Sequence, residues 1–251
     1  MLNEIADYFD GILRTDEWKG IDSSSNGIQV ENSGEVEKVA FAVDAAAQTI
    51  YEAGKRDADM LVVHHGIIWG GLERVTGQEY RRIRRLMKND IALYVSHLPL
   101  DAHEEVGNNA CLLRSLNATP TDTFGEVGGK EIGYVGRLPQ PVDFDSFVYR
   151  VEDLLDFKSD VLGFGAEEVQ EIAVLTGAGG DMVGEVQETG ADVYISGEPK
   201  HRAYHDAQEL GMNVVFAGHY QTETFGVKAL QESVEREFDV ETVFIDVPTS
   251  V

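Results

Sequence analysis

Cysteine is almost absent from this sequence: Cys111 is the one thiol among 251 residues. A lone cysteine excludes a disulfide within the chain and a metal site made of several thiolates, and it is typical of a reducing cytoplasm. Long apolar runs are missing as well, since none approaches the roughly 18 residues that a membrane span requires. Residues 1–4 lack the basic-then-apolar pattern of a secretory signal. The sequence therefore predicts a cytoplasmic protein with no membrane partner.

Basic residues are scarce relative to acidic ones. Lysine and arginine total 20 against 45 aspartates and glutamates, which gives a formal net charge of −25. A surface of this charge repels nucleic acids and anionic membranes, so neither is expected to bind. The acids are spread through amphipathic segments, which is typical of solvated helix faces. We interpret the charge as a halophilic adaptation to a salt-rich cytoplasm, where a Debye length of about 3 Å at 1 M salt screens the repulsion.

The chain contains an internal duplication. Segment 39–44 aligns with 172–177, and the alignment continues without a gap, so that 52–63 falls on 185–196. Each copy reads strand, turn, helix and strand, and a further helix and strand follow in both. Generic βαβ segments can also resemble one another by chance. However, both copies end in a histidine with an acid four residues later, which favours two related α/β units.

Hydrophobic periodicity predicts the individual elements. Helices are expected over 2–13, 46–54, 79–89, 107–116, 144–155, 202–210 and 223–238, and strands over 39–43, 60–63, 91–96, 172–175, 193–196, 214–217 and 240–246. Segment 119–141, rich in glycine, threonine and proline, is predicted to be the internal boundary.

Two adjacent histidines, His64 and His65, follow the apolar, β-branched run 60–63. Such a run predicts a buried strand, and α/β sheets place their ligands at the carboxyl ends of strands. Neutral imidazoles bind first-row transition metals well. From this peptide alone, two surface histidines on a loop are an equal alternative, so the rest of the chain must decide.

Other metal-binding side chains also follow predicted strands: His97, Asp101, His219 and Glu223. Imidazoles combined with carboxylates suit zinc, iron, manganese, cobalt or nickel better than calcium or magnesium. One ion takes three or four ligands, whereas five or six indicate two divalent ions about 3.5–4 Å apart, which can activate a bridging water. Glu223 is the expected bridging carboxylate. His97 either binds a metal or orients Asp101.

A second group is predicted to surround the metals or to hold a substrate. Glu198, Lys200 and His201 follow a predicted strand, and there a lysine and a histidine would bind an anionic group of a small molecule. His201 and His205, four residues apart on a helix, could instead form a separate metal pair. The glycine-rich turn 176–181 could cradle a phosphate. Because it lacks the established phosphate-loop spacings, a tight turn between strand and helix is favoured.

Several motifs match a known family over essentially the whole chain. They are segments 25–30, 63–66, 97–101, 177–180, 197–201 and 218–223. Through them the chain resembles the GTP cyclohydrolase 1 type 2 homologue family, also called Nif-three-like dinuclear metal proteins. The resemblance implies two divalent metal ions per chain, bound by His64, His65, Asp101, His219 and Glu223. It also implies two intertwined α/β units with mixed sheets and a toroidal homohexamer.

The division of the chain and its activity follow as expectations. The first unit is expected at 1–120, with the paired histidines, and the second at 121–251, whose last part, about 212–251, returns to complete the metal site. The resemblance implies a metal-dependent hydrolase that acts on a nucleotide or related small molecule through a metal-activated water. A non-enzymatic metal store, chaperone or adaptor is the alternative that the sequence leaves open.

Overall fold

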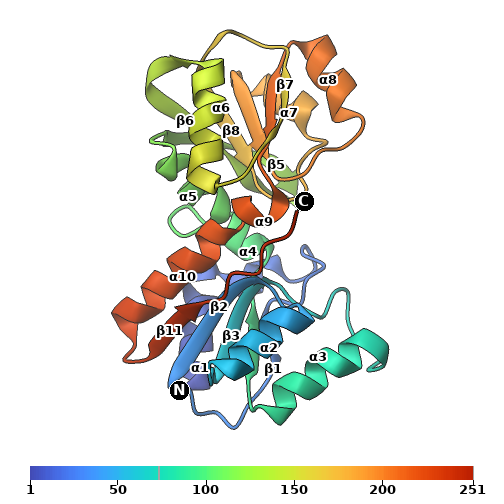
Figure 1. The fold of residues 1–251 in the computed structure, drawn as a ribbon, viewed down its shortest axis with the longest axis vertical. Helices are drawn as coiled ribbons and strands as arrows, with labels where there is room; N and C mark the ends of the chain where they lie inside the picture. Colours follow the sequence, from blue (N-terminus) through green and yellow to red (C-terminus); the bar gives the residue numbers. More distant parts are fainter. Residues whose placement is uncertain (73, 251) are drawn as a thin grey trace. The chain divides into compact units, whose positions relative to one another are not determined.

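The computed structural model describes residues 1–72 and 74–250, which form two compact α/β units (Figure 1). Unit 1 comprises Met1–Leu100 and Gly226–Val247, and unit 2 comprises Asp101–Phe225 with the last residues from Pro248. Each unit therefore takes up segments that are distant in the sequence. Among the described residues, no helix has both the length and the apolar character that a membrane crossing requires.

Unit 1 is built on a sheet with the strand order β1-β4-β3-β2-β11. Strands β2, β3, β4 and β11 run parallel, and β1 pairs antiparallel with β4. The strands are β1 (Gly27–Val30), β2 (Lys38–Asp44), β3 (Met60–His65), β4 (Ala92–Val95) and β11 (Glu241–Phe244). The helices are α1 (Leu2–Leu13), the 3-10 helix η1 (Thr15–Trp18), α2 (Ala47–Lys55) and α3 (Gly77–Lys88). Two more helices, α4 (Leu98–Asp101) and α10 (Thr224–Glu237), contain points where the chain changes unit.

The core of unit 1 explains why 60–63 is a continuous apolar run. β3 pairs with β2 and β4 along its two edges, and each residue in 60–63 is fully buried, so both faces of the strand are covered as well. Ile50 of α2 and Leu86 of α3 belong to the same hydrophobic cluster as Leu61. Both helices are amphipathic and bury only their apolar stripes. The sheet thereby fixes the carboxyl end of β3, where the paired histidines stand.

Unit 2 is built on a sheet with the strand order β5-β6-β8-β9-β10-β7. Strands β8, β9 and β10 run parallel, β5, β6 and β8 pair antiparallel, and β7 pairs antiparallel with β10. The strands are β5 (Thr119–Val127), β6 (Lys130–Asp143), β7 (Asp160–Gly163), β8 (Glu168–Leu175), β9 (Val193–Ser196) and β10 (Asn213–Phe216). The helices are α5 (Asn108–Ser115), α6 (Phe144–Leu155), α7 (Val183–Glu188), α8 (Ala203–Leu210) and α9 (His219–Thr222).

The two units repeat one arrangement. In unit 1 the parallel strands β2, β3 and β4 alternate with α2 and α3, and in unit 2 the parallel strands β8, β9 and β10 alternate with α7 and α8. The third strand of each set pairs antiparallel with a further strand, β1 or β7. This confirms the predicted α/β class with duplicated units and mixed sheets. Helices α1 and α6 begin and end at the predicted residues.

The segment predicted as a boundary is instead a β-hairpin. β5 and β6 take up most of 119–143 and pair antiparallel. Gly128 and Gly129, both at positive φ (58° and 85°), form the turn between them, a conformation that favours glycine in hairpins. Pro139 and Pro141 lie where the register with β8 shifts. The composition indicated a boundary because glycine, threonine and proline are used in hairpins as well as in linkers.

The boundary between the two units accordingly lies at residues 100/101 and not at the predicted 120/121. Helix α5 packs in unit 2, where Leu113 joins Tyr134 and Val174 in one core cluster. The segment that returns to unit 1 is 226–247 rather than about 212–251. The reason is that β11 pairs with β2 and that Ile245 is buried in the core of unit 1, whereas β10 belongs to the sheet of unit 2.

Candidate metal centre

Three histidines form a cluster in unit 1. His64 and His65 end β3, and His97 follows β4. Because β3 and β4 are neighbouring parallel strands, with Val63 opposite Val95, their carboxyl ends meet at one edge of the sheet. Nitrogen atoms of the three imidazoles all lie within 4.8 Å of one another, and their ring centroids are 4.6 to 5.7 Å apart. This histidine cluster could therefore hold a metal ion.

Two imidazoles of the cluster are held by neighbouring strands. His64 is fully buried, and its Nδ1 lies 2.9 Å from the carbonyl oxygen of Ser96, at the end of β4. His65 places its Nδ1 2.9 Å from Oδ1 of Asp44, the residue opposite it in the register of β2 and β3. Metal-bound histidines make this kind of bond through the second nitrogen, which fixes the tautomer and the orientation of the ring.

His97 is held by Asp22, which the sequence reasoning missed. The Asp22 carboxylate lies 2.9 Å from Nδ1 of His97, and it accepts bonds from the Asn26 side chain and from the backbone N–H groups of Ser24 and Leu98. Burial acts to raise the pKa of Asp22, but these hydrogen bonds, led by that of His97, outweigh it and lower the pKa to about 2. The carboxylate is therefore ionised at neutral pH. Motif 25–30, which contains Asn26, was the nearest signal in the sequence.

Gly66 and Gln29 brace the turn after the paired histidines. Oε1 of Gln29 accepts hydrogen bonds from the backbone N–H groups of Ile67 and Ile68, at 2.9 and 3.0 Å. A β-carbon at Gly66 would lie 2.5 Å from the Gln29 amide, so a side chain does not fit there. The turn presents Trp69, which is 41% exposed and packs edge-on against the ring of His97 at 4.9 Å.

A second cluster in unit 2 combines an imidazole with carboxylates. His219 begins α9, directly after β10, and its Nε2 lies 3.2 Å from Oε2 of Glu223. Its Nδ1 lies 3.3 Å from Oε2 of Glu198, which follows the adjacent parallel strand β9. Burial acts to lower the pKa of His219, but the two carboxylates, Glu223 first, raise it to about 9. Lys200 is 2.6 Å from Glu198 and, together with His219, lowers the pKa of that carboxyl.

Asp101 is buried in unit 2 and held by polar side chains. The Asn108 amide donates to its Oδ1 at 2.9 Å, and the hydroxyl of Thr176 lies 3.5 Å from the same oxygen. The Asn109 side chain donates to the Asp101 carbonyl and accepts from the backbone N–H of Thr176. These contacts connect Asp101 to Thr176, which directly follows β8 and directly precedes Gly177.

The glycine-rich turn packs against the second cluster. Gly177 has φ +65°, and a β-carbon there would lie 2.1 Å from Oε1 of Glu223 and 3.2 Å from Nε2 of His219. At Gly197 a β-carbon would lie 2.4 Å from the Gly177 carbonyl oxygen. The backbone N–H of Gly177 donates to the hydroxyl of Thr222. Glycine is required here because the backbone touches the acid and the imidazole, which supports the tight-turn interpretation of 176–181.

Both units contribute predicted site residues. Unit 1 brings together His64, His65 and His97, while unit 2 brings together His219, Glu223 and Glu198, with Lys200 beside them and Asp101 linked through Thr176 and Gly177. His201 is exposed just before α8, with its ring 6.2 Å from that of His205. Its role in holding a substrate stays a prediction, as does the division of ligands between two ions.

The whole chain matches a known protein family. Residues 1–250 match the model of Duf34/NIF3 (NGG1p interacting factor 3). The chain belongs to this family. A GTP cyclohydrolase 1 type 2 homolog of Archaeoglobus fulgidus is 43% identical over 250 residues, covering 100% of this chain and 99% of that protein. One from Pyrococcus abyssi is 45% identical over 250 residues, covering 99% and 98%.

A solved structure matches this Duf34/NIF3 chain over its full length. The ybgI protein, described as of unknown function, has a TM-score of 0.92 at 34% identity, covering 100% of this chain and 99% of that one. The resemblance inferred from the motifs is therefore confirmed, as is the fold class.

The side chains of this Duf34/NIF3 protein fit a divalent transition metal. Three imidazoles gather within ligand distance of one another, and each is oriented through Nδ1. Imidazole nitrogens and carboxylate oxygens are the donors that zinc, iron, manganese, cobalt and nickel accept. His219, which is partly exposed, and the buried Glu223 add an imidazole–carboxylate pair of the same chemistry.

Proposed function

We propose that this Duf34/NIF3 protein is a dinuclear metal-binding hydrolase. Two divalent transition-metal ions per chain would be held by His64, His65, Asp101, His219 and Glu223. The substrate is a nucleotide or a related small anionic molecule. The observation that carries the proposal is the histidine cluster, whose three rings gather at one sheet edge and are each oriented through Nδ1.

The combined ligand set is supported by the motifs and by the chain itself. Asp101 ends α4, a single helical turn that begins directly after His97. Four residues in a helix rise only about 6 Å, so the covalent chain limits how far the backbone at Asp101 can lie from the histidine cluster. His219 and Glu223 are likewise four residues apart and bonded to each other. Five ligands with two carboxylates suit two ions better than one.

The chain's own residues prepare the site for hydrolysis. Two bound ions would supply an activated water and a Lewis acid for the atom under attack. Asp44 and Asp22 hold the imidazoles of His65 and His97 in one tautomer. Lys200, with a side chain 40% exposed, offers a positive charge beside the second cluster for an anionic group of the substrate.

The proposal is tested first by metal content and then by turnover. Mass spectrometry of the purified protein should find two transition-metal ions per chain, with fewer in His64→Ala and Glu223→Gln. His205→Ala, which removes an exposed histidine from α8, is the matched control and should keep both ions. The metal-loaded protein is then assayed on GTP and on a panel of nucleotides and phosphoesters.

The outcomes separate the hydrolase from its alternative. Turnover that disappears in Asp101→Ala and Glu223→Ala supports hydrolysis at the metals. Full metal occupancy without turnover on any compound instead favours a metal store, chaperone or adaptor, which should pass its metal to an apo-protein.

We also propose a homohexamer, for which light scattering should give about six times the 27.6 kDa of one chain.

A further inference from the structure

Basic charge is concentrated on one helix of this acidic protein. Helix α3 carries five of the 20 lysines and arginines in a chain of net charge −25: Arg81, Arg82, Arg84, Arg85 and Lys88. Packing explains only the buried side of α3, where Leu86 enters the core of unit 1. No other helix among the described residues carries more than two lysines or arginines, so the composition of α3 requires a different reason.

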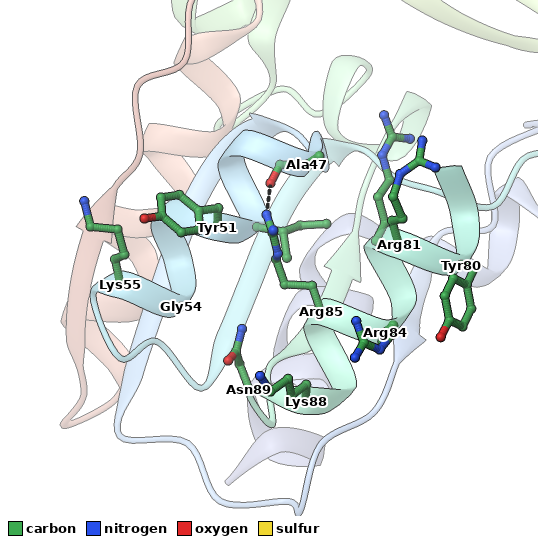
Figure 2. A pocket seen from close by; sticks show the side chains of 12 residues that line it. Ala47, Tyr51, Gly54, Lys55, Tyr80, Arg81, Arg84, Arg85, Lys88 and Asn89 are labelled. Atoms are coloured by element: carbon green, nitrogen blue, oxygen red, sulfur yellow. Dashed lines mark hydrogen bonds between the residues drawn. The ribbon is translucent and has the colours of Figure 1, made fainter. Parts of the chain in front are cut away.

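These cations border a cavity between α2 and α3, which we call the basic groove (Figure 2). Its volume is about 510 Å³, within the range of roughly 300–1,000 Å³ that small-molecule sites occupy. Helix α2 contributes Tyr51 and Lys55 to the lining, and α3 contributes the arginines with Tyr80. The groove lies entirely within unit 1 and uses none of the proposed metal ligands.

The groove is partly preorganised for an anion. Nη1 of Arg85 donates to the backbone carbonyl of Ala47 at 3.0 Å, which ties α3 to the start of α2 (Figure 2). The Arg85 guanidinium also lies over the ring of Tyr51, 5.3 Å from its centroid, and the Lys55 ammonium lies 5.5 Å from the same centroid. Two cations therefore converge on one aromatic ring before any ligand is present.

Glu52 pairs with Lys55 of the groove at 3.8 Å, but most of the charge that α3 contributes is not neutralised within the described part of the chain. No carboxylate among residues 1–72 and 74–250 is ion-paired with Arg81, Arg84 or Lys88, and Nε of Arg82 is buried without a hydrogen-bond partner. Arg81, Arg84, Arg85 and Lys88 are spaced i, i+3, i+4 and i+7, so they share one helix face about 10 Å long. Such a row of like charges is self-repelling and is stabilised when an anion lies along it.

We propose that the basic groove binds a chain of phosphate groups, as in a small di- or triphosphate. A row about 10 Å long is longer than one phosphate, so several linked phosphates use it more fully. Arginine forks match phosphate oxygens in a bidentate manner. A long nucleic acid would extend beyond the groove onto an acidic surface that repels it, whereas a short polyanion ends within the basic patch.

Calorimetric titration of the full-length protein with inorganic tripolyphosphate tests this directly. In the variant Arg81→Gln/Arg84→Gln/Lys88→Gln, affinity should fall about tenfold or more, because three charge-assisted contacts are lost. The control Lys19→Gln/Lys158→Gln/Arg236→Gln removes the same charge from side chains that are 77%, 86% and 68% exposed, and it should bind like the unmodified protein. If the triple groove variant fails to fold, the single variant Arg84→Gln should still show a weaker affinity.

Two further titrations identify the binding site and the kind of molecule that supplies the phosphates. His64→Ala should keep full tripolyphosphate affinity, which separates the groove from the proposed metal centre. ATP that binds more tightly than tripolyphosphate indicates a nucleotide, and equal binding of both indicates free polyphosphate. Absence of binding, equal affinity in the groove and control variants, or loss in His64→Ala alone would overturn the proposal. These results do not depend on whether the metal centre is hydrolytic.

Discussion

The bond between Asp44 and His65 should set the affinity of the metal centre. Asp44 lies 2.9 Å from Nδ1 of His65 and has a side chain 35% exposed. A charge-assisted hydrogen bond is worth about 1.5–3 kcal/mol when buried, and solvent screening at this exposure places Asp44 near the lower end. Since about 1.4 kcal/mol corresponds to tenfold in affinity, Asp44→Ala should weaken metal binding about tenfold.

A competition titration against a chromophoric chelator measures this affinity. Asp44→Asn should recover most of it, because the amide oxygen still accepts the Nδ1 hydrogen and keeps the ring in place. The matched control is Asp7→Ala, which removes one negative charge from an exposed position on α1 of the same unit. If Asp44→Ala and Asp7→Ala bind metal equally well, Asp44 does not orient a ligand and the reasoning about the histidine cluster is refuted.

Three other predictions concern stability. Asp143 caps α6 by accepting from the Ser146 N–H at 2.9 Å, so Asp143→Ala should lower the free energy of unfolding measured in urea. Backbone and side-chain bonds from Ser146 lower the pKa of Asp143, so this contribution should be present above pH 3.8 and vanish as the pH falls through the lowered value. Gly177→Ala should destabilise the protein by more than about 1 kcal/mol in the same assay, because φ is +65° and the new carbon meets Glu223 at 2.1 Å. Gly184→Ala, in open space on α7, should be stabilising or neutral. The net charge of −25 should make the melting temperature rise with added salt, and a melting temperature that is independent of salt would contradict the halophilic interpretation.

The sequence predicted those parts of the fold whose signals are local. The run 60–63 is apolar because β3 is covered on both faces, and this placed His64 and His65 at a strand end. Helices α1 and α6 have clear amphipathic periods and were predicted with their observed bounds. The hairpin 119–143 was missed because its glycines and prolines serve turns and register shifts inside a sheet, which composition does not distinguish from a linker.

The candidate site was predictable in its metal-binding residues but not in the residues that orient them. Asp22 and His97 are separated by 75 positions, and only the folded chain places them 2.9 Å apart. Asp44 and His65 meet because β2 and β3 pair in that register, and a one-residue slip would separate them. Gly177 was recognised as part of a turn, but its contact with Glu223 depends on how β8 and α9 pack.

A crystal structure of the metal-loaded protein, with anomalous scattering recorded at the absorption edge of the metal that copurifies, tests the central claim most directly. We predict two strong anomalous peaks per chain, both in contact with side chains among His64, His65, Asp101, His219 and Glu223. A single peak, or peaks that are bound by other residues, would contradict the dinuclear centre.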